Sequence, residues 1–211
     1  MKNQINAINK KYLELIDSTP KSLIDKLKED AIIRFAYNTN AIEGSTITLQ
    51  ETLLILKDKI APSGKSLREI HEIENTKLAL DFIEKCIEKK DLDENIILKI
   101  HKILMKSIDE ENGGKWRTRQ VIISGTFIPF AIREFLDWYY ESKDKMHAVE
   151  LAALVHLKFV LIHPFIDGNG RVSRLLMNYV LLKNQYPLLF ISNRLREEYY
   201  NALEEGNKGN Y

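Results

Sequence analysis

The sequence predicts an all-α domain that carries one small β-hairpin. Segments of helical length, with apolar residues three and four positions apart, fill most of the 211-residue chain. One stretch differs: in residues 115–130, β-branched and aromatic residues flank a central Ser-Gly pair, which predicts a hairpin, with an irregular loop as the alternative. A composition of 45% hydrophobic and 29% charged residues is ordinary for a globular protein. These observations favour one compact, mostly helical unit.

The predicted helices follow one another with short breaks between them. Capping residues mark several of their starts, since Thr48 with Glu51, and Ser66 with Glu69, have the spacing of a capping box. In chain order, the predicted helices cover about residues 3–17, 22–42, 46–60 (after a short turn), 66–90, 93–108, 132–145, 147–162, 171–182 and 194–205.

Charge and composition argue against several classes of protein. The net charge is +1, so there is no electrostatic case for a nucleic-acid partner. The single cysteine, Cys86, excludes an internal disulfide. The N-terminus lacks an apolar signal core, and the longest apolar run, 151–162, is too short to span a bilayer. We therefore expect a cytoplasmic protein without a nucleic-acid or membrane partner.

The highest density of chemically active side chains lies between His163 and Arg174, in HPFIDGNGRVSR. Pro164 disfavours a helical conformation at His163, so the preceding helix should end there. The two glycines permit a tight turn, and a helix that starts near Arg171 offers free N–H groups and its dipole to an anion. Arg171 and Arg174 lie three positions apart and share one face. The pattern predicts a phosphate-binding turn with a histidine at its entrance.

Two better-known phosphate motifs do not fit this turn. It lacks the GxxxxGK of a P-loop, and no predicted strand precedes it as in a dinucleotide fingerprint. A histidine before a proline, or a Gly-Asn-Gly turn, is by itself usually structural. Packing gives no reason for an aspartate, an asparagine and two arginines at one helix start, so we interpret the combination as functional.

The stretch resembles the signature of the Fic-domain family, H-x-F-x-[DE]-G-N-G-R-x-x-R, at every fixed position. The resemblance implies a helical domain with the activity of a protein adenylyltransferase. Such an enzyme transfers AMP from ATP to a Ser, Thr or Tyr hydroxyl of a target protein. ATP is then the substrate, Mg²⁺ the cofactor and a protein with an acceptor hydroxyl the partner.

The resemblance also implies roles for individual residues. His163 would be the catalytic base, since a histidine can accept a hydroxyl proton near neutral pH. Asp167 would be the protein ligand of Mg²⁺. The residues expected to bind ATP are Gly168, Asn169, Gly170, Arg171 and Arg174 at the phosphates, and Tyr199, Tyr200 and Asn207 at the adenine and ribose.

A second segment, TNAIEG, gains an interpretation from the same family. Thr39 and Glu43 share a helical face, and spacing alone favours a solvated glutamate beside a capping glycine. Many Fic proteins carry an inhibitory helix with the pattern [ST]-x-x-x-E-[GN], which Thr39, Glu43 and Gly44 match. In the class where this helix precedes the core, the glutamate pairs with the second arginine, here Arg174. We therefore divide the chain into residues 1–45, with the inhibitory helix, and a catalytic core, 46–211.

The predicted hairpin corresponds to the family's flap, along which a target segment adds as a strand. The candidate flap residues are Val121, Ile122, Ser124, Gly125, Thr126 and Phe127. Other Fic chemistry stays open, such as removal of AMP or transfer of phosphate or phosphocholine. Phosphate-transferring relatives usually have lysine at the position of Gly170, which argues against that branch, and the intact signature argues against a non-catalytic interaction module. The target and the oligomeric state, a homo-oligomer included, are not determined by the sequence.

Overall fold

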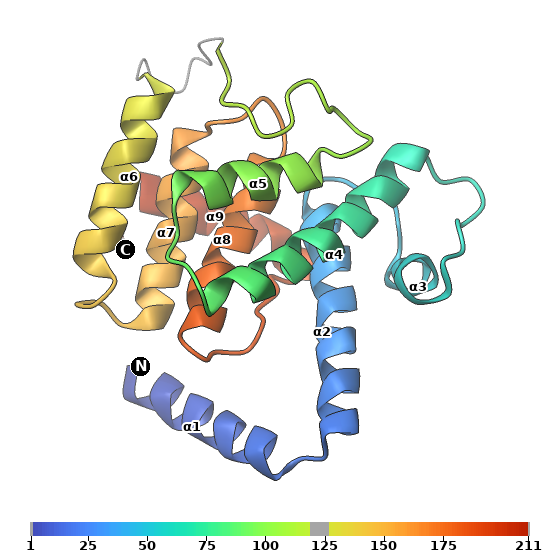
Figure 1. The fold of residues 1–211 in the computed structure, drawn as a ribbon, viewed down its shortest axis with the longest axis horizontal. Helices are drawn as coiled ribbons and strands as arrows, with labels where there is room; N and C mark the ends of the chain where they lie inside the picture. Colours follow the sequence, from blue (N-terminus) through green and yellow to red (C-terminus); the bar gives the residue numbers. More distant parts are fainter. Residues whose placement is uncertain (1, 119–126, 211) are drawn as a thin grey trace.

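Helices make up the regular structure of the computed structural model, which describes residues 2–118 and 127–210 (Figure 1). Short loops join them, as the sequence predicts. In chain order they are α1 (Lys2–Ser18), α2 (Lys21–Ile42), α3 (Leu49–Leu53) with a π-helical turn (Leu54–Asp58), α4 (Leu67–Ile87), α5 (Glu94–Leu104), α6 (Ile128–Ser142), α7 (Ala148–Ile162), α8 (Asn169–Lys183), a 3₁₀ turn (Asn193–Leu195) and α9 (Arg196–Asn207). The all-helical prediction is confirmed.

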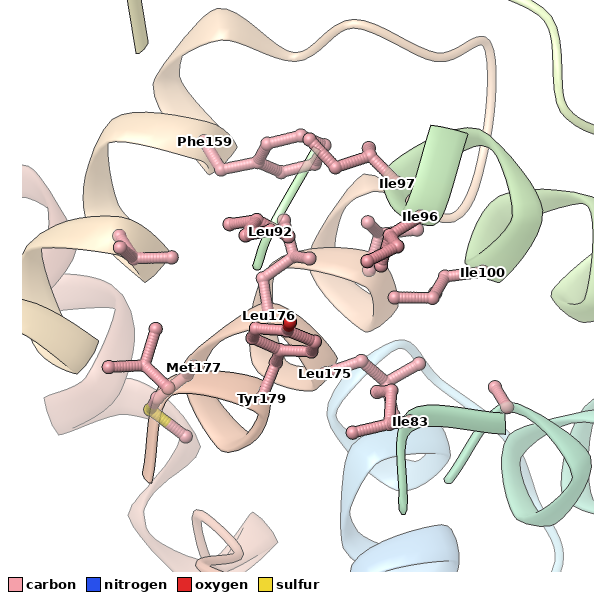
Figure 2. Packing of buried hydrophobic residues seen from close by; sticks show 14 of the residues in the cluster. Ile83, Leu92, Ile96, Ile97, Ile100, Phe159, Leu175, Leu176, Met177 and Tyr179 are labelled. Carbon is pink, nitrogen blue, oxygen red and sulfur yellow. The ribbon is translucent and has the colours of Figure 1, made fainter. Parts of the chain in front are cut away.

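Helix α8 lies at the centre of the molecule, and nearly every residue from Asn169 to Leu181 is buried. It packs along α7, to which a short loop joins it, and against α4 and α5. Figure 2 shows this core, in which side chains of α8 meet those of the surrounding segments: Ile83, Leu92, Ile96, Ile97, Ile100, Phe159, Leu175, Leu176, Met177 and Tyr179. Burial of this apolar surface is the main stabilising term of such a core. The N-terminal end of α8 is therefore held in a fixed place.

A second, smaller apolar cluster attaches α2 and the π-helical turn after α3 to α4. Its buried members are Ile33, Ala36, Ile47, Ile55, Leu56, Ile70 and Ile73. Only the C-terminal half of α2 takes part, because Leu23 and Leu27 in its first turns are exposed although they share a face with buried Phe35. The cluster places the last turn of α2 beside α4 and α8.

Several predicted helix boundaries are confirmed and others need correction. Both capping boxes form, at Thr48 and at Ser66. The helix predicted over 93–108 ends at Leu104, because the chain then turns and Ser107 takes a positive φ of 60°. The helix predicted from residue 132 begins at Ile128, with a proline in its first turn, where the missing N–H group costs nothing.

The predicted hairpin is only partly covered by the described residues. The candidate flap residues Val121, Ile122, Ser124, Gly125 and Thr126 lie outside them, so that part stays a prediction. Residues 128–130, expected in the hairpin, belong to α6, and exposed Phe127 directly precedes that helix. The two described ranges contain no strand, and none of their helices is long and apolar enough to cross a membrane.

Candidate active site

The loop from His163 to Gly168 joins the end of α7 to the start of α8. His163 caps α7 with a left-handed backbone (φ 51°), and Gly168 caps α8 with φ 78°. A Cβ on Gly168 would lie 2.9 Å from the Met105 side chain, so glycine is needed there for space as well as for its backbone angle. Helix α8 starts at Asn169, two residues before the predicted Arg171, because Gly168 already completes the turn.

Asn169 braces the loop through its side chain. Its Oδ1 atom accepts a hydrogen bond from the Phe165 N–H group (2.9 Å), and its Nδ2 atom donates to the Phe165 carbonyl (2.9 Å). The residue is 3% exposed. Both ends of its amide thus pair with backbone groups that would otherwise be buried and unpaired, and its contact with phosphate stays a prediction.

His101, a residue of α5, also supports this loop, a contact that the sequence did not indicate. Its ring stacks on Phe165, with 3.6 Å between ring centroids. Nδ1 accepts a hydrogen bond from the Gly114 N–H group (3.0 Å), so the ring proton lies on Nε2, which donates to the Asp167 carbonyl (3.2 Å). Burial lowers the pKa of His101 to about 4, so the ring is neutral at pH 7. His101 thus holds the carbonyl of a proposed metal ligand.

His163 is half-buried at the end of α7. Its carbonyl accepts a hydrogen bond from Arg117 Nε (2.7 Å), which fixes the backbone. Burial lowers the pKa of His163 below its ordinary value, although the Val160 backbone acts in the opposite direction. The charges of Glu43 and Asp167 also act on this ring and oppose the lowering of its pKa.

The structure brings Arg174 together with the last turn of α2. Its Nε atom donates to Thr39 Oγ1 (2.7 Å), and its Nη2 atom contacts both the Thr39 carbonyl (3.0 Å) and Glu43 Oε1 (2.6 Å). The Arg174 side chain is 2% exposed and that of Glu43 36%. Gly44 follows with φ 100°, which ends the helix. The pair joins residues 131 positions apart in the sequence.

Gly170 makes room for the Glu43 carboxylate. A Cβ at this position would lie 2.2 Å from Glu43 Oε1 and 3.2 Å from Arg174 Nη1. The first distance is far shorter than any real contact, so only glycine lets the two charged groups meet over the start of α8 in the observed arrangement.

Tyr199 and buried His156 complete the surroundings of Arg174. Arg174 Nη1 donates to the Tyr199 hydroxyl (3.1 Å), and that hydroxyl lies 2.9 Å from His156 Nε2. Burial, followed by the charge of Arg174, lowers the pKa of His156 to about 3, so the ring is neutral at pH 7. Of the other two predicted ribose and adenine residues, Tyr200 lies beside Tyr199 (5.2 Å between ring centroids) and packs on Arg196, and Asn207 is exposed at the end of α9. Their contacts with the nucleotide stay a prediction.

Asp167 belongs to a network of ion pairs with Arg68, Arg171 and Glu72. Asp167 Oδ2 accepts from Arg68 Nη2 (2.6 Å), and Oδ1 accepts from the Gly168 N–H group (2.6 Å) and lies 3.5 Å from Arg171 Nη2. Glu72 lies 3.2 Å from both Arg68 Nε and Arg171 Nη1. Arg171 is thus turned toward two carboxylates, whereas the sequence suggested a phosphate contact. Burial raises the pKa of Asp167, but Arg171, Gly168 and Arg68 outweigh it, so the pKa lies below its usual value.

The donor set at Asp167 fits Mg²⁺ that arrives with a nucleotide. Mg²⁺ is usually held by one or two carboxylates, with phosphate oxygens and water as its other ligands. In the described ranges, no group of three or more His, Cys, Asp or Glu side chains could hold a metal. Asp167 is ionised, its side chain is 44% exposed, and it adjoins the start of α8, where a helix dipole favours an anion.

Comparison with known proteins identifies the class to which this fold and site belong. Residues 91–181 match the model of the Fic/DOC family, so the chain contains a Fic/DOC family domain.

Among curated proteins, the chain is 35% identical over 222 residues to protein adenylyltransferase Fic of Drosophila ananassae, and 37% identical over 196 residues to that of Drosophila willistoni. These alignments cover 97% and 89% of this chain but 45% and 39% of the relatives, so the chain spans less than half the length of either.

Solved structures share the fold over almost the whole chain. The structure of Fic-1 from C. elegans has a TM-score of 0.90 at 29% identity, covering 99% of this chain and 63% of the other. A Fic domain containing signaling protein from Bacteroides thetaiotaomicron has a TM-score of 0.85 at 26% identity, covering 97% and 80%. The helices outside the matched family segment, such as α2 with Glu43, thus also have counterparts in related folds.

Proposed function

We propose that this chain is a protein adenylyltransferase that transfers AMP from ATP to a hydroxyl group of a target protein, and that Glu43 restrains it. The observation that carries the proposal is the arrangement at the start of α8. A neutral histidine, an ionised aspartate and a buried arginine surround free helical N–H groups. The names of the relatives, protein adenylyltransferase Fic, support the same activity.

In this mechanism His163 accepts the proton of the target hydroxyl as its oxygen attacks the α-phosphate of ATP, and pyrophosphate leaves. General-base assistance of this kind typically contributes about 10²–10⁴-fold to the rate. Arg174 and the N–H groups at the start of α8 bind the phosphates and offset their charge. Asp167 would hold Mg²⁺, which supplies further charge neutralisation on the phosphates. Positioning and electrostatics carry most of the catalysis in related phosphoryl transfers.

Glu43 restrains the enzyme because it occupies Arg174. With the pair at 2.6 Å, a γ-phosphate that approaches Arg174 meets a carboxylate. Two like charges about 4 Å apart repel by roughly 4 kcal/mol at an effective dielectric constant of 20. The nucleotide would then bind with its triphosphate displaced, so that the α-phosphate is out of line with the target hydroxyl. Such displacement can cost on the order of 10²-fold in rate.

Incubation with α-³²P-ATP or γ-³²P-ATP tests both parts of the proposal. Protein label from α-³²P-ATP alone indicates AMP transfer, whereas label from γ-³²P-ATP indicates phosphate transfer. Loss of label from a target already carrying AMP would indicate AMP removal. We expect weak α label with the wild type and at least tenfold more with Glu43→Gly.

The matched control is Glu88→Gly, since Glu88 is also an exposed helix-capping glutamate, at the end of α4. This variant should behave as the wild type. Arg174→Ala should be inactive and should not be rescued by Glu43→Gly, because the arginine itself binds phosphate. Equal activity of the wild type and Glu43→Gly would mean that TNAIEG is only a helix end with a glycine cap.

A further inference from the structure

Two charged groups of the chain itself occupy the two charged ends of the site. At the phosphate end, the Glu43 carboxylate lies on Arg174 at 2.6 Å. At the metal end, the Arg68 guanidinium lies on Asp167, with Nη2 2.6 Å from Oδ2. Each group has the sign of charge of the ligand that would replace it: a carboxylate stands in for phosphate, and a guanidinium stands in for a divalent cation.

We propose that Arg68 is a built-in competitor of the divalent cation for Asp167, so that binding of the metal–nucleotide complex requires its displacement. The inference rests on the proposed function, because it takes Asp167 as the metal ligand. It goes beyond restraint by Glu43, since it concerns the opposite end of the site and a different charge. Arg68 thereby sets how much divalent cation the site needs.

The position of Arg68 makes it the removable partner of Asp167. It lies in the first turn of α4, and its side chain is 56% exposed. Its Nε atom is 3.2 Å from Glu72 Oε1, so the guanidinium keeps a carboxylate partner after it leaves Asp167. Arg171, the other cation at Asp167, has a side chain only 4% exposed and lies farther away, at 3.5 Å. Arg68 is therefore the cation that moves, and Arg171 the one that stays.

Competition follows from the geometry of the carboxylate. Oδ1 accepts the Gly168 N–H group at 2.6 Å, which leaves Oδ2 as the more available oxygen, and Arg68 binds there. Mg²⁺ needs a carboxylate oxygen at about 2.0–2.1 Å and would be repelled by a guanidinium that stays at the same oxygen. Because half-exposed ion pairs contribute little, the effect on metal affinity should be modest.

The test is a Mn²⁺ titration of the full chain in the presence of α,β-methylene-ATP, with free Mn²⁺ followed by electron paramagnetic resonance. All proteins carry Glu43→Gly, so that the phosphate end is open. We expect Arg68→Gln to bind Mn²⁺ about three- to fivefold more tightly than the parent, and Asp167→Asn to lose most of the binding.

Arg34→Gln is the matched control, because Arg34 forms an equally exposed pair with Asp30, at 2.7 Å, away from the site. It should leave the Mn²⁺ affinity unchanged. If Arg68→Gln binds Mn²⁺ as the parent does or more weakly, while Asp167→Asn loses binding, the competition is wrong and the metal site stands. If Asp167→Asn binds as the parent does, both the metal ligand of the proposed function and this inference are wrong.

Discussion

The arginines at the start of α8 differ from the charged groups that face them from neighbouring helices in how deeply they are buried. Arg174 and Arg171 have side chains 2% and 4% exposed, and Asn169 is fixed by two hydrogen bonds to backbone. The groups that face them from α2 and α4, Glu43 and Arg68, are 36% and 56% exposed. We call the first region the floor (163–174) and the second the rim (39–44 and Arg68).

This contrast separates two tasks. A buried, hydrogen-bonded group is costly to move, because its partners would be left unpaired. An exposed ion pair contributes only about 0–1 kcal/mol and can be exchanged for a ligand. The floor therefore suits chemistry that needs fixed positions, and the rim suits reversible restraint. The predictions below test that division, beginning with the largest expected effect.

The first prediction removes the base from the floor. His163→Ala should lower AMP transfer by about 10²–10⁴-fold, because no other group then accepts the hydroxyl proton. Nucleotide affinity, measured by calorimetry, should stay within about twofold, since the ring faces the target and not the triphosphate. With His163 intact the rate should rise with pH, with a midpoint below about 6.5, because burial lowers the pKa of His163.

The surface residue His71 provides the control, and His71→Ala should keep full activity. A fall in nucleotide affinity comparable to the fall in activity would contradict the role of base. An unchanged rate with His163→Ala would contradict the assignment altogether.

The second prediction removes an uncharged side chain that holds the floor together. Asn169→Ala leaves the Phe165 N–H and carbonyl groups buried without their partner, each at a cost of about 1–3 kcal/mol. We expect the free energy of unfolding in urea to fall by about 3 kcal/mol. Asn207→Ala, at the exposed end of α9, should change it by less than about 0.5 kcal/mol. Equal effects of the two substitutions would show that the loop does not depend on Asn169.

Much of this arrangement could be predicted from the sequence, since it depends on local patterns. Helical spacing, the two capping boxes and the break at His163-Pro164 located the helices. The signature indicated the residues of the floor, and the TNAIEG pattern indicated that Glu43 and Arg174 would meet. The flap residues from Val121 to Thr126 lie outside the described residues, so that part stays a prediction.

The unpredicted contacts are those that tertiary packing creates between unremarkable residues. Arg68 reaches Asp167 across 99 positions, and nothing in its helical neighbourhood marks it. No sequence motif marks His101 or His156, yet each is buried and its ring is hydrogen-bonded to a residue of another segment. The signature shows that Asn169 is polar and lies in a turn. It does not show that its amide turns inward to the backbone.

The third prediction is that acid lowers the free energy of unfolding, because two buried histidines must stay neutral in the fold. His101 stacks on Phe165 of the floor, and His156 contacts Tyr199 beside Arg174. Burial lowers their pKa values to about 4 and about 3. Below about pH 6.5 the unfolded chain binds protons that the folded protein does not, so stability falls as the pH falls from 6.5 toward 4. Between pH 7 and 5.5 we expect each histidine to reduce the free energy of unfolding by about 1 kcal/mol.

Urea unfolding at the two pH values measures this effect. His101→Gln should remove about half of the pH dependence, whereas His71→Gln, on the surface of α4, controls for the loss of a histidine. Equal stability of the wild type at pH 7 and 5.5 would mean that these rings are not held neutral in the fold.

The fourth prediction measures how the rim and the floor are coupled, through Gly170 and Glu43. Alanine is favoured over glycine inside a helix by about 0.5–1 kcal/mol. In the wild type this gain should be lost, because a Cβ at Gly170 would lie 2.2 Å from Glu43 Oε1 and the carboxylate would have to leave its place. In the Glu43→Gly protein the obstacle is absent, and only the 3.2 Å approach to Arg174 Nη1 remains.

Urea unfolding of the wild type, Gly170→Ala, Glu43→Gly and the double variant completes a thermodynamic cycle. We expect Gly170→Ala to destabilise the wild type by about 0.5 kcal/mol and to stabilise Glu43→Gly by a similar amount, a coupling of about 1 kcal/mol. A coupling near zero would show that Glu43 moves aside at no cost, so that its contact with Arg174 is too weak to restrain the floor. A coupling of the expected size would show that the absence of a side chain at Gly170 keeps the carboxylate in place.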